Sequence, residues 1–206
     1  NTATPSPQNG VTTVIIGNCG FTIAPCRPAD REITLKNLTK VEGIPYDALK
    51  RGVNWNFETF GEYLCAIEAR GTVPNIACFV GHSSIRTWAM GDDARHRPAN
   101  PQEIDRMCDL LGEALAEGAI GFSTSFSESH NGEGGLPVAS RLADAAELEA
   151  LAGVLRGKNQ GTLQITRGNT ATIQSIGALQ AIAGRPLQMS AVMTVPKFPE
   201  MSKQDM

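Results

Sequence analysis

The chain has 206 residues, of which 41% are hydrophobic and 19% charged, a composition typical of a globular protein with one sizeable core. Its formal net charge of −3 and the lack of a basic tract argue against nucleic acid or anionic membrane surfaces as partners. No apolar run approaches the ~18 residues of a membrane-spanning helix. The five cysteines are scattered without a CxxC pair, which predicts a reducing, cytoplasmic compartment rather than a disulfide framework.

Residues 1–9 are polar with two prolines and are expected to form a loop. The stretch GVTTVIIGNCG at 10–20 then predicts a buried strand that ends in a tight turn. Gly17 and Gly20 permit the sharp backbone, and the turn presents Cys19 where the strand stops. A thiolate at that place is a metal ligand or a nucleophile, and a small buried thiol is the structural alternative.

Prolines and glycines interrupt residues 21–54, which are expected to be irregular, and a polar loop is expected between the second strand and Asn100. Capping residues and apolar spacing predict helices that begin near Thr59, Asn100, Asp144 and Thr170. Apolar runs predict further strands over 73–80, 119–125, 162–166 and 186–193.

Five predicted strands thus alternate with four helices, which favours an α/β fold with a parallel sheet and right-handed crossovers. Two strand-to-helix links are long, after residue 20 and over 126–143, and both lie on the carboxyl side of the strands. Ordinary links in such folds have ~2–6 residues, much longer ones are usually functional, and this side is where such folds carry out chemistry. Five strands cannot close an eight-stranded barrel, so an open doubly wound sheet and a piece of a larger barrel both remain open.

Five segments carry a resemblance to a known family: GVTTVIIGNCG at 10–20, VEGIP at 41–45, NWNFETFGEYL at 54–64, VGHSSIR at 80–86 and GAIGFSTS at 118–125. In order and spacing they resemble the D-aminoacylase group, the N-acyl-D-amino-acid deacylases, of the amidohydrolase superfamily. GNCG together with GFSTS is a specific combination, whereas each alone is weak. The resemblance covers about residues 10–155 well and weakens beyond them.

The resemblance implies a (β/α)₈ TIM-type barrel beside a small β-sandwich, and hydrolysis of N-acyl-D-amino acids with one or two metal ions, usually zinc. On this analogy residues 1–206 are a single domain, a fragment that supplies the second to sixth barrel strands. A first strand with a His-x-His ligand pair would precede Asn1, and an eighth strand with the catalytic aspartate would follow Met206. Cys19 matches the family's metal-ligand cysteine, since a thiolate is a strong zinc ligand.

Two departures from the family pattern concern the metal. The fifth and sixth barrel strands of the family each end with a metal-binding histidine, but the corresponding stretches here read LQITRGN (163–169) and LQMSAVM (187–193). Ile165 or Thr166 stands near the first place and Ala191 near the second. An alkyl or hydroxyl side chain does not replace imidazole as a zinc ligand, so zinc occupancy in this chain is in doubt.

Other side chains are candidates for contact with a small-molecule amide substrate. His82 ends a strand and is either a substrate or second-layer contact, or a hydrogen-bonded structural histidine. The residues Ser123, Thr124 and Ser125 end another strand and either bind substrate or satisfy local backbone. Arg86 and Arg167 are the candidate carboxylate clamps, with surface ion pairs as the alternative. His96 is expected to be solvated. His130 lies in the glycine-rich loop after GFSTS and either moves toward a ligand or is an exposed loop residue.

Three hypotheses follow for function. The parent protein is a metal-dependent amidohydrolase whose general base lies outside this chain, or the chain is a divergent barrel that binds a small molecule without hydrolysis, or it is a truncated and inactive product. The first and third are compatible. An unclosed barrel also leaves two sheet edges, which predicts self-association or coverage of the edges by the chain's own loops.

Overall fold

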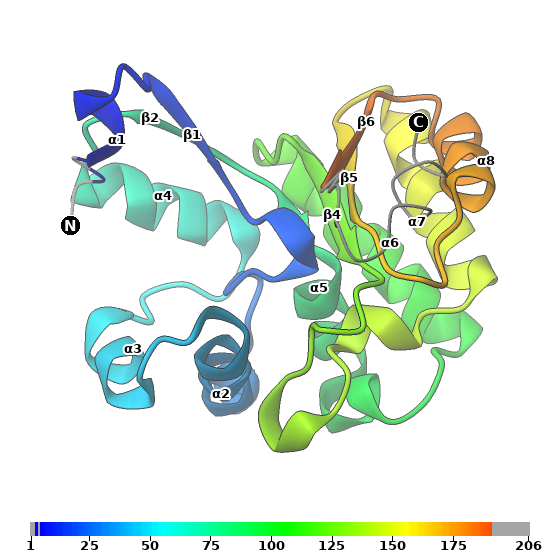
Figure 1. Ribbon diagram of the computed structural model, residues 1–206, viewed down its shortest axis with the longest axis horizontal. Helices are drawn as coiled ribbons and strands as arrows, with labels where there is room; N and C mark the ends of the chain where they lie inside the picture. The colour runs from blue at the N-terminus through cyan, green and yellow to red at the C-terminus, as the bar shows by residue number, and fades with distance from the viewer. Residues whose placement is uncertain (1–2, 4, 191–206) are drawn as a thin grey trace, which may run out of the picture.

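Parallel strands form the centre of the computed structural model, which describes residue 3 and residues 5–190 (Figure 1). The described strands are β1 (Thr13–Ile16), β2 (Asn75–Cys78), β3 (Val80–Gly81), β4 (Gly121–Ser125), β5 (Thr162–Thr166) and β6 (Leu187–Ser190). β1 pairs with β2, while β3, β4, β5 and β6 are neighbours in that order, and every pairing is parallel. The predicted parallel sheet is therefore confirmed.

The two hydrogen-bonded sheets are continuous through Phe79, the single residue between β2 and β3. Its N–H donates to the carbonyl of Ile16 on the β1 side, and Ile120 donates to the carbonyl of Cys78 from the β4 side. The described strands thus form five adjacent strand positions whose spatial order equals their order in sequence. An open doubly wound sheet reverses its strand order at a switch point, and the described strands contain no such reversal.

Helices cover this sheet in the same progression. α5 packs on α6, α6 on α7, and α7 on α8, and α6, α7 and α8 lie together on one side of β4, β5 and β6 (Figure 1). Strands that advance in one direction with crossovers of one hand place their helices on one face, which is the geometry of a barrel wall. The described α-helices are α1 (Pro5–Gln8), α2 (Arg31–Glu42), α3 (Tyr46–Gly52), α4 (Phe60–Arg70), α5 (His82–Met90), α6 (Pro101–Ala116), α7 (Ala145–Lys158) and α8 (Ile173–Ala183).

The predicted helix starts that depend on local capping are confirmed. Thr59 and Glu62 form a reciprocal capping box at α4, and Asn100 and Glu103 form another at α6. In each box one side chain accepts from the helix's third N–H, and the acidic side chain accepts from the capping residue's own N–H. Asp144 likewise caps α7 by accepting from its third N–H.

Three predictions of irregular structure were wrong. Residues 21–54 contain α2 and α3, because their punctuating residues stand at helix ends: Gly43 ends α2 in the left-handed conformation, and Pro45 precedes α3. The expected polar loop after the second strand contains α5, which begins directly at His82 without a side-chain cap. The loop expected over 1–9 also includes the short α1. Part of the strand predicted over 186–193 lies outside the described residues.

The core lies between the sheet and this helical layer. Its largest fully buried apolar side chains include Phe122 and Ile165 from the sheet, and it also contains Leu111, Leu115, Leu151 and Leu155 from α6 and α7. Within the described part, no helix combines the length and apolar character that crossing a bilayer demands.

Candidate functional site

The carboxyl end of β1 forms a tight turn that carries Cys19. Cys19 lies in the one-turn 3-10 segment η1 (Asn18–Gly20), is half-buried, and has a left-handed backbone with φ of 66°. Gly17 before it has φ of 84°, and a Cβ added there would lie 2.6 Å from the carbonyl oxygen of Phe79. The turn therefore requires glycine at this position. The prediction that Cys19 is presented at a strand end is confirmed, at the same end as the long links. The prediction that this strand is buried was wrong, because the residues of β1 are exposed or half-buried.

Two side chains from distant strands hold this turn. The Ser123 hydroxyl accepts from the Gly20 N–H at 3.1 Å and donates to the Gly17 carbonyl at 2.5 Å. The Gln164 amide oxygen accepts from the Cys19 N–H at 2.9 Å. Ser123 and Gln164 are both fully buried and are partners in the β4–β5 register. The interior face of the sheet therefore supplies the contacts that fix the Cys19 turn.

The ends of β5 and β6 continue this polar face. The Gln164 amide nitrogen donates to the Ser190 hydroxyl at 2.9 Å and lies 3.4 Å from the Thr166 hydroxyl. The Thr166 and Ser190 hydroxyls lie 3.2 Å apart, and these two residues are partners in the β5–β6 register. Ser125 is the β4 partner of Thr166, so the three strand ends present a row of hydroxyl groups.

These residues do not fit a zinc ion. Zinc takes four ligands from thiolate, imidazole and carboxylate groups, whereas the partners around the Cys19 turn are hydroxyls and an amide. Among residues 3 and 5–190 no group of three or more histidine, cysteine or acidic side chains is placed to hold a metal. Ala191, the other place where the family has histidine, lies outside the described residues.

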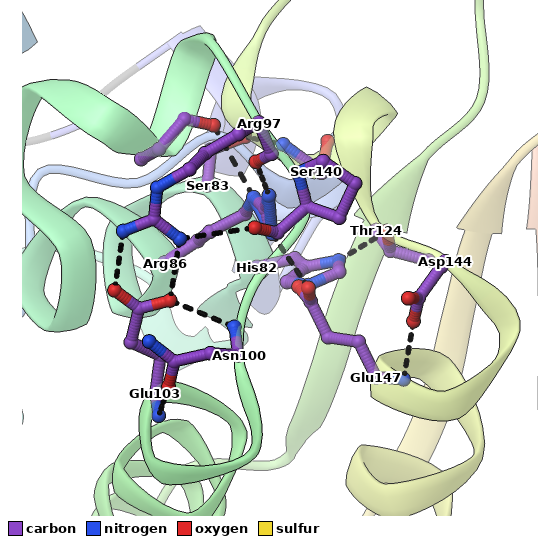
Figure 2. A network of polar contacts seen from close by, with 12 residues as sticks. His82, Ser83, Arg86, Arg97, Asn100, Glu103, Thr124, Ser140, Asp144 and Glu147 are labelled. Carbon is purple, nitrogen blue, oxygen red and sulfur yellow. Dashed lines mark hydrogen bonds and ion pairs between the residues drawn. The ribbon is translucent and has the colours of Figure 1, made fainter.

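His82 belongs to a buried polar network on the other side of the sheet (Figure 2). Its Nδ1 lies 2.8 Å from the Thr124 hydroxyl, and its Nε2 lies 2.7 Å from Oε1 of Glu147. The second carboxylate oxygen of Glu147 accepts from the Arg86 guanidinium at 2.5 Å. The side chains of His82, Arg86 and Glu147 have no exposed area. The geometry is that of the hydrogen-bonded structural histidine.

The Arg86 guanidinium uses its remaining donors on loop backbone. It donates to the carbonyls of Ala94 at 3.2 Å and Arg97 at 2.6 Å. Burial lowers the pKa of Arg86, and the nearby Glu147 carboxylate opposes that shift. At the surface beyond it, Arg97 pairs with Glu103 and holds the pKa of that carboxyl at about 2. The network therefore ties β4, α5 and α7 to the loop before α6.

Alternation along β4 divides the three predicted hydroxyl residues between the two faces of the sheet. Ser123 and Ser125 face the interior, where Ser123 holds the Cys19 turn, and Thr124 faces the helices and His82. His82, Arg86 and Thr124 belong to the buried network that connects the sheet to the helices, which is a structural role. Contact of any of these three side chains with a substrate stays a prediction.

Two further candidates lie near the row of hydroxyls. The Ser125 hydroxyl lies 2.7 Å from Nδ1 of His130, which is half-buried in the long β4–α7 link, and burial lowers the pKa of this histidine. Arg167 follows β5; its N–H donates to the Ser190 carbonyl and its Nε donates to the Ala171 carbonyl. A carboxylate clamp by Arg167 remains a prediction. His96 is exposed, as the sequence predicted.

Sequence reasoning missed Gln164 and Glu147 as site residues. Gln164 stands between Leu163 and Ile165 in the strand TLQIT. A polar side chain in a buried apolar strand usually has a buried hydrogen-bond partner, and this pattern was the available signal. Glu147 lies in the first turn of the helix that the sequence predicted to begin near Asp144. In the structure its backbone N–H donates to the side chain of the capping residue Asp144, while its carboxylate contacts His82 and Arg86. Nothing local in the sequence indicates that second role.

Comparison with known proteins relates this geometry to a family. No protein-family model matches the sequence. The D-aminoacylase of Alcaligenes xylosoxydans xylosoxydans is 42% identical over 121 residues, which are 59% of this chain and 22% of that protein. A solved structure of D-aminoacylase, an enzyme with a binuclear metal centre, superposes with a TM-score of 0.66 at 30% identity. The superposition covers 89% of this chain and 35% of the D-aminoacylase chain.

This chain is a relative of the D-aminoacylases. N-acyl-D-glutamate deacylase from Bordetella bronchiseptica, solved with zinc and a phosphonate mimic of the tetrahedral intermediate, also superposes, with a TM-score of 0.63 at 27% identity. That match covers 88% of this chain and 34% of the deacylase. The sheet therefore corresponds to part of an amidohydrolase barrel. The chain spans about a fifth of the curated D-aminoacylase it matches and about a third of the solved structures.

Proposed function

We propose that this chain is part of a metal-dependent amidohydrolase that cleaves N-acyl-D-amino acids to a D-amino acid and a carboxylate. The observation that carries the proposal is the turn that holds Cys19 at the carboxyl end of β1, in a chain 42% identical to a D-aminoacylase over 121 residues. In this proposal residues 1–206 supply the second to sixth barrel strands, and Cys19 is a metal-ligand position. Because the described residues do not complete a zinc site, we expect this chain alone to be inactive.

Substrate contacts within this proposal lie at the carboxyl ends of the strands. Ser125 ends β4, and Arg167 directly follows the neighbouring β5. A guanidinium binds a carboxylate in a bidentate way, so Arg167 is the proposed partner of the substrate carboxylate. Ser123 contributes through the turn, because its hydroxyl both accepts from Gly20 and donates to Gly17. The role of this side chain is therefore to hold Cys19 in place.

A second function is favoured by one specific observation. The ends of β5 and β6 present the Thr166 and Ser190 hydroxyls, which bond to each other and to the amide of Gln164. Such groups bind polar small molecules through hydrogen bonds and are poor zinc ligands. The alternative is therefore a divergent barrel that binds a small molecule without hydrolysing it.

The deciding experiment assays N-acetyl-D-amino acids with this chain and with the product of any longer reading frame that contains it, alongside metal analysis. We expect no turnover by this chain. From the longer product we expect D-specific hydrolysis with bound metal, and loss of more than about 100-fold in activity on Cys19→Ala, as expected for loss of a metal-site group. A longer product that binds the compounds without metal or turnover would instead establish the binding function.

We further propose that the chain acts in a reducing compartment, the cytoplasm, and that it self-associates. All five cysteines are unpaired, which supports the first proposal. Large apolar side chains are exposed at and beside β1 and β2, including Val11, Ile15 and Val73, which supports the second. Sedimentation at several concentrations tests the second, and a monomer throughout the range would refute it.

A further inference from the structure

The Cys19 backbone adopts a left-handed conformation, which is unfavourable for a non-glycine residue without stabilising contacts. Its φ of 66° lies in the left-handed region, which side chains with a Cβ adopt at an energetic cost. The next residue, Gly20, packs so closely on β4 that an added Cβ would lie 3.0 Å from the Cα of Thr124. Contacts outside the turn must therefore maintain its shape.

Gln164 provides such a contact in only one orientation of its amide. The Cys19 N–H is a donor, so the Gln164 atom facing it must be the oxygen. The amide nitrogen then faces the Ser190 and Thr166 hydroxyls, both of which accept hydrogen bonds. The Gln164 side chain is fully buried, and its amide is satisfied at both ends. A single side chain thus connects the turn after β1 to the ends of β5 and β6.

Ser123 holds the same turn from a second direction. Its hydroxyl contacts Gly17 and Gly20, the residues that flank Asn18 and Cys19, whereas Gln164 contacts Cys19 itself. With Ser123 alone the two ends of the turn stay attached to β4, and the Cys19 N–H loses its partner. The conformation of Cys19 itself therefore depends on Gln164.

We propose that Gln164 is the positioning residue of Cys19, and that its amide sets the geometry of the turn without a metal ion. The inference deepens the proposed function, since Cys19 is the metal-ligand position there. In a metal site the ligands from different strands are held together by the ion. In this chain the amide of Gln164 makes the equivalent connection between β1, β5 and β6.

Thiol modification of Cys19 tests this without metal or substrate. In a background with Cys65→Ser and Cys108→Ser, the remaining cysteines besides Cys19 are Cys26 and Cys78, which are buried and whose pKa burial raises to about 11. The rate of reaction with a disulfide reagent at fixed pH, with EDTA present, then reports on Cys19. We expect Gln164→Met to raise that rate at least fivefold.

Gln188 is the matched control. It is the β6 register partner of Gln164, and its side chain is exposed and makes no hydrogen bond to another described residue. We expect Gln188→Met to change the Cys19 rate by less than twofold. An equal rate in Gln164→Met and the parent, or an equal acceleration in both variants, would overturn the proposal. Faster reaction of the parent on adding EDTA would also overturn it, because a metal would then hold the turn.

Amide hydrogen exchange gives a second readout if Gln164→Met does not fold. Gln164→Glu retains an acceptor oxygen for the Cys19 N–H, so we expect the Cys19 amide to stay protected in this variant. Ser190→Ala removes the partner that orients the amide nitrogen, and we expect faster exchange at Cys19. Unchanged exchange in Ser190→Ala together with lost protection in Gln164→Glu would refute the assigned hydrogen bonds. Absence of hydrolase activity would bear on the proposed function alone.

Discussion

Removing the buried carboxylate of Glu147 is expected to destabilise the fold strongly. Glu147→Leu leaves the Arg86 guanidinium with two backbone carbonyls as partners, and it leaves Nε2 of His82 without its 2.7 Å contact. Breaking a fully buried ion pair costs about 3–5 kcal/mol, because an uncompensated charge stays inside the protein. With a urea m-value of about 2 kcal/mol per molar, a loss of about 4 kcal/mol lowers the unfolding midpoint by about 2 M.

A double-mutant cycle isolates the pair. Arg86→Met is expected to cost a similar amount, since it leaves the Glu147 carboxylate buried with His82 alone. The double variant Glu147→Leu, Arg86→Met removes both charges, so its loss is expected to be smaller than the sum by at least about 2 kcal/mol. Urea unfolding followed by circular dichroism measures all three variants.

The exposed pair Arg97–Asp93 is the control for this cycle. Its charged atoms lie 2.9 Å apart, but the side chains are 40% and 59% exposed. Solvent-exposed pairs of this kind couple by about 0.2–1 kcal/mol. If the Glu147–Arg86 cycle gave a coupling no larger than this control, the reasoning about uncompensated buried charge would be refuted.

Three further variants test other parts of the structure. Gly20→Ala is expected to destabilise the fold by more than about 1 kcal/mol, since it combines φ of 71° with a 3.0 Å approach to Thr124, and unchanged urea stability would contradict the tight turn. Asn100→Ala removes the α6 cap and is expected to cost about 0.5–2 kcal/mol in the same assay. Burial lowers the pKa of His130 below its ordinary 6.5. The imidazole in the unfolded chain therefore binds a proton more tightly than in the folded protein. Stability is lost as the pH falls from 6.5 through the folded-state pKa. His130→Gln is therefore expected to make unfolding midpoints less dependent on pH between about 7 and about 5, and an unaltered pH profile would refute this sign.

The sequence predicted those features of the fold that depend on neighbours in the chain. The capping boxes at Thr59 and Asn100 involve residues three apart, and the alternation of strands and helices follows from apolar spacing. α2 and α5 were missed for a physical reason. α2 buries only Leu35 fully, so its apolar stripe is weak, and α5 begins at Gly81 and His82, where no side chain caps the helix.

The residues of the candidate site also divide into those that local sequence predicts and those that it does not. Cys19 could be predicted because glycines on either side specify a turn at a strand end. Gln164 could not, because its contact with Cys19 joins residues 145 apart in sequence and exists only when β5 is in register with β4. The same holds for Glu147 and His82, which are 65 residues apart. Such contacts are set by the packing of the elements, which local patterns do not contain.

Alternation of side chains along the strands connects the Cys19 contacts with the buried network of Glu147, Arg86 and His82. Because successive side chains of a strand face opposite sides, the register that joins Ser123 to Gln164 also directs Thr124 toward the helices and His82. The interior face then carries neutral hydroxyl and amide groups around Cys19, while the charges of Glu147 and Arg86 compensate each other behind the sheet. A one-residue slip of β4 would exchange these faces, placing Thr124 against the turn and burying two serines among the helices. The position of Cys19 and the stability of the buried ion pair are therefore two consequences of one strand register.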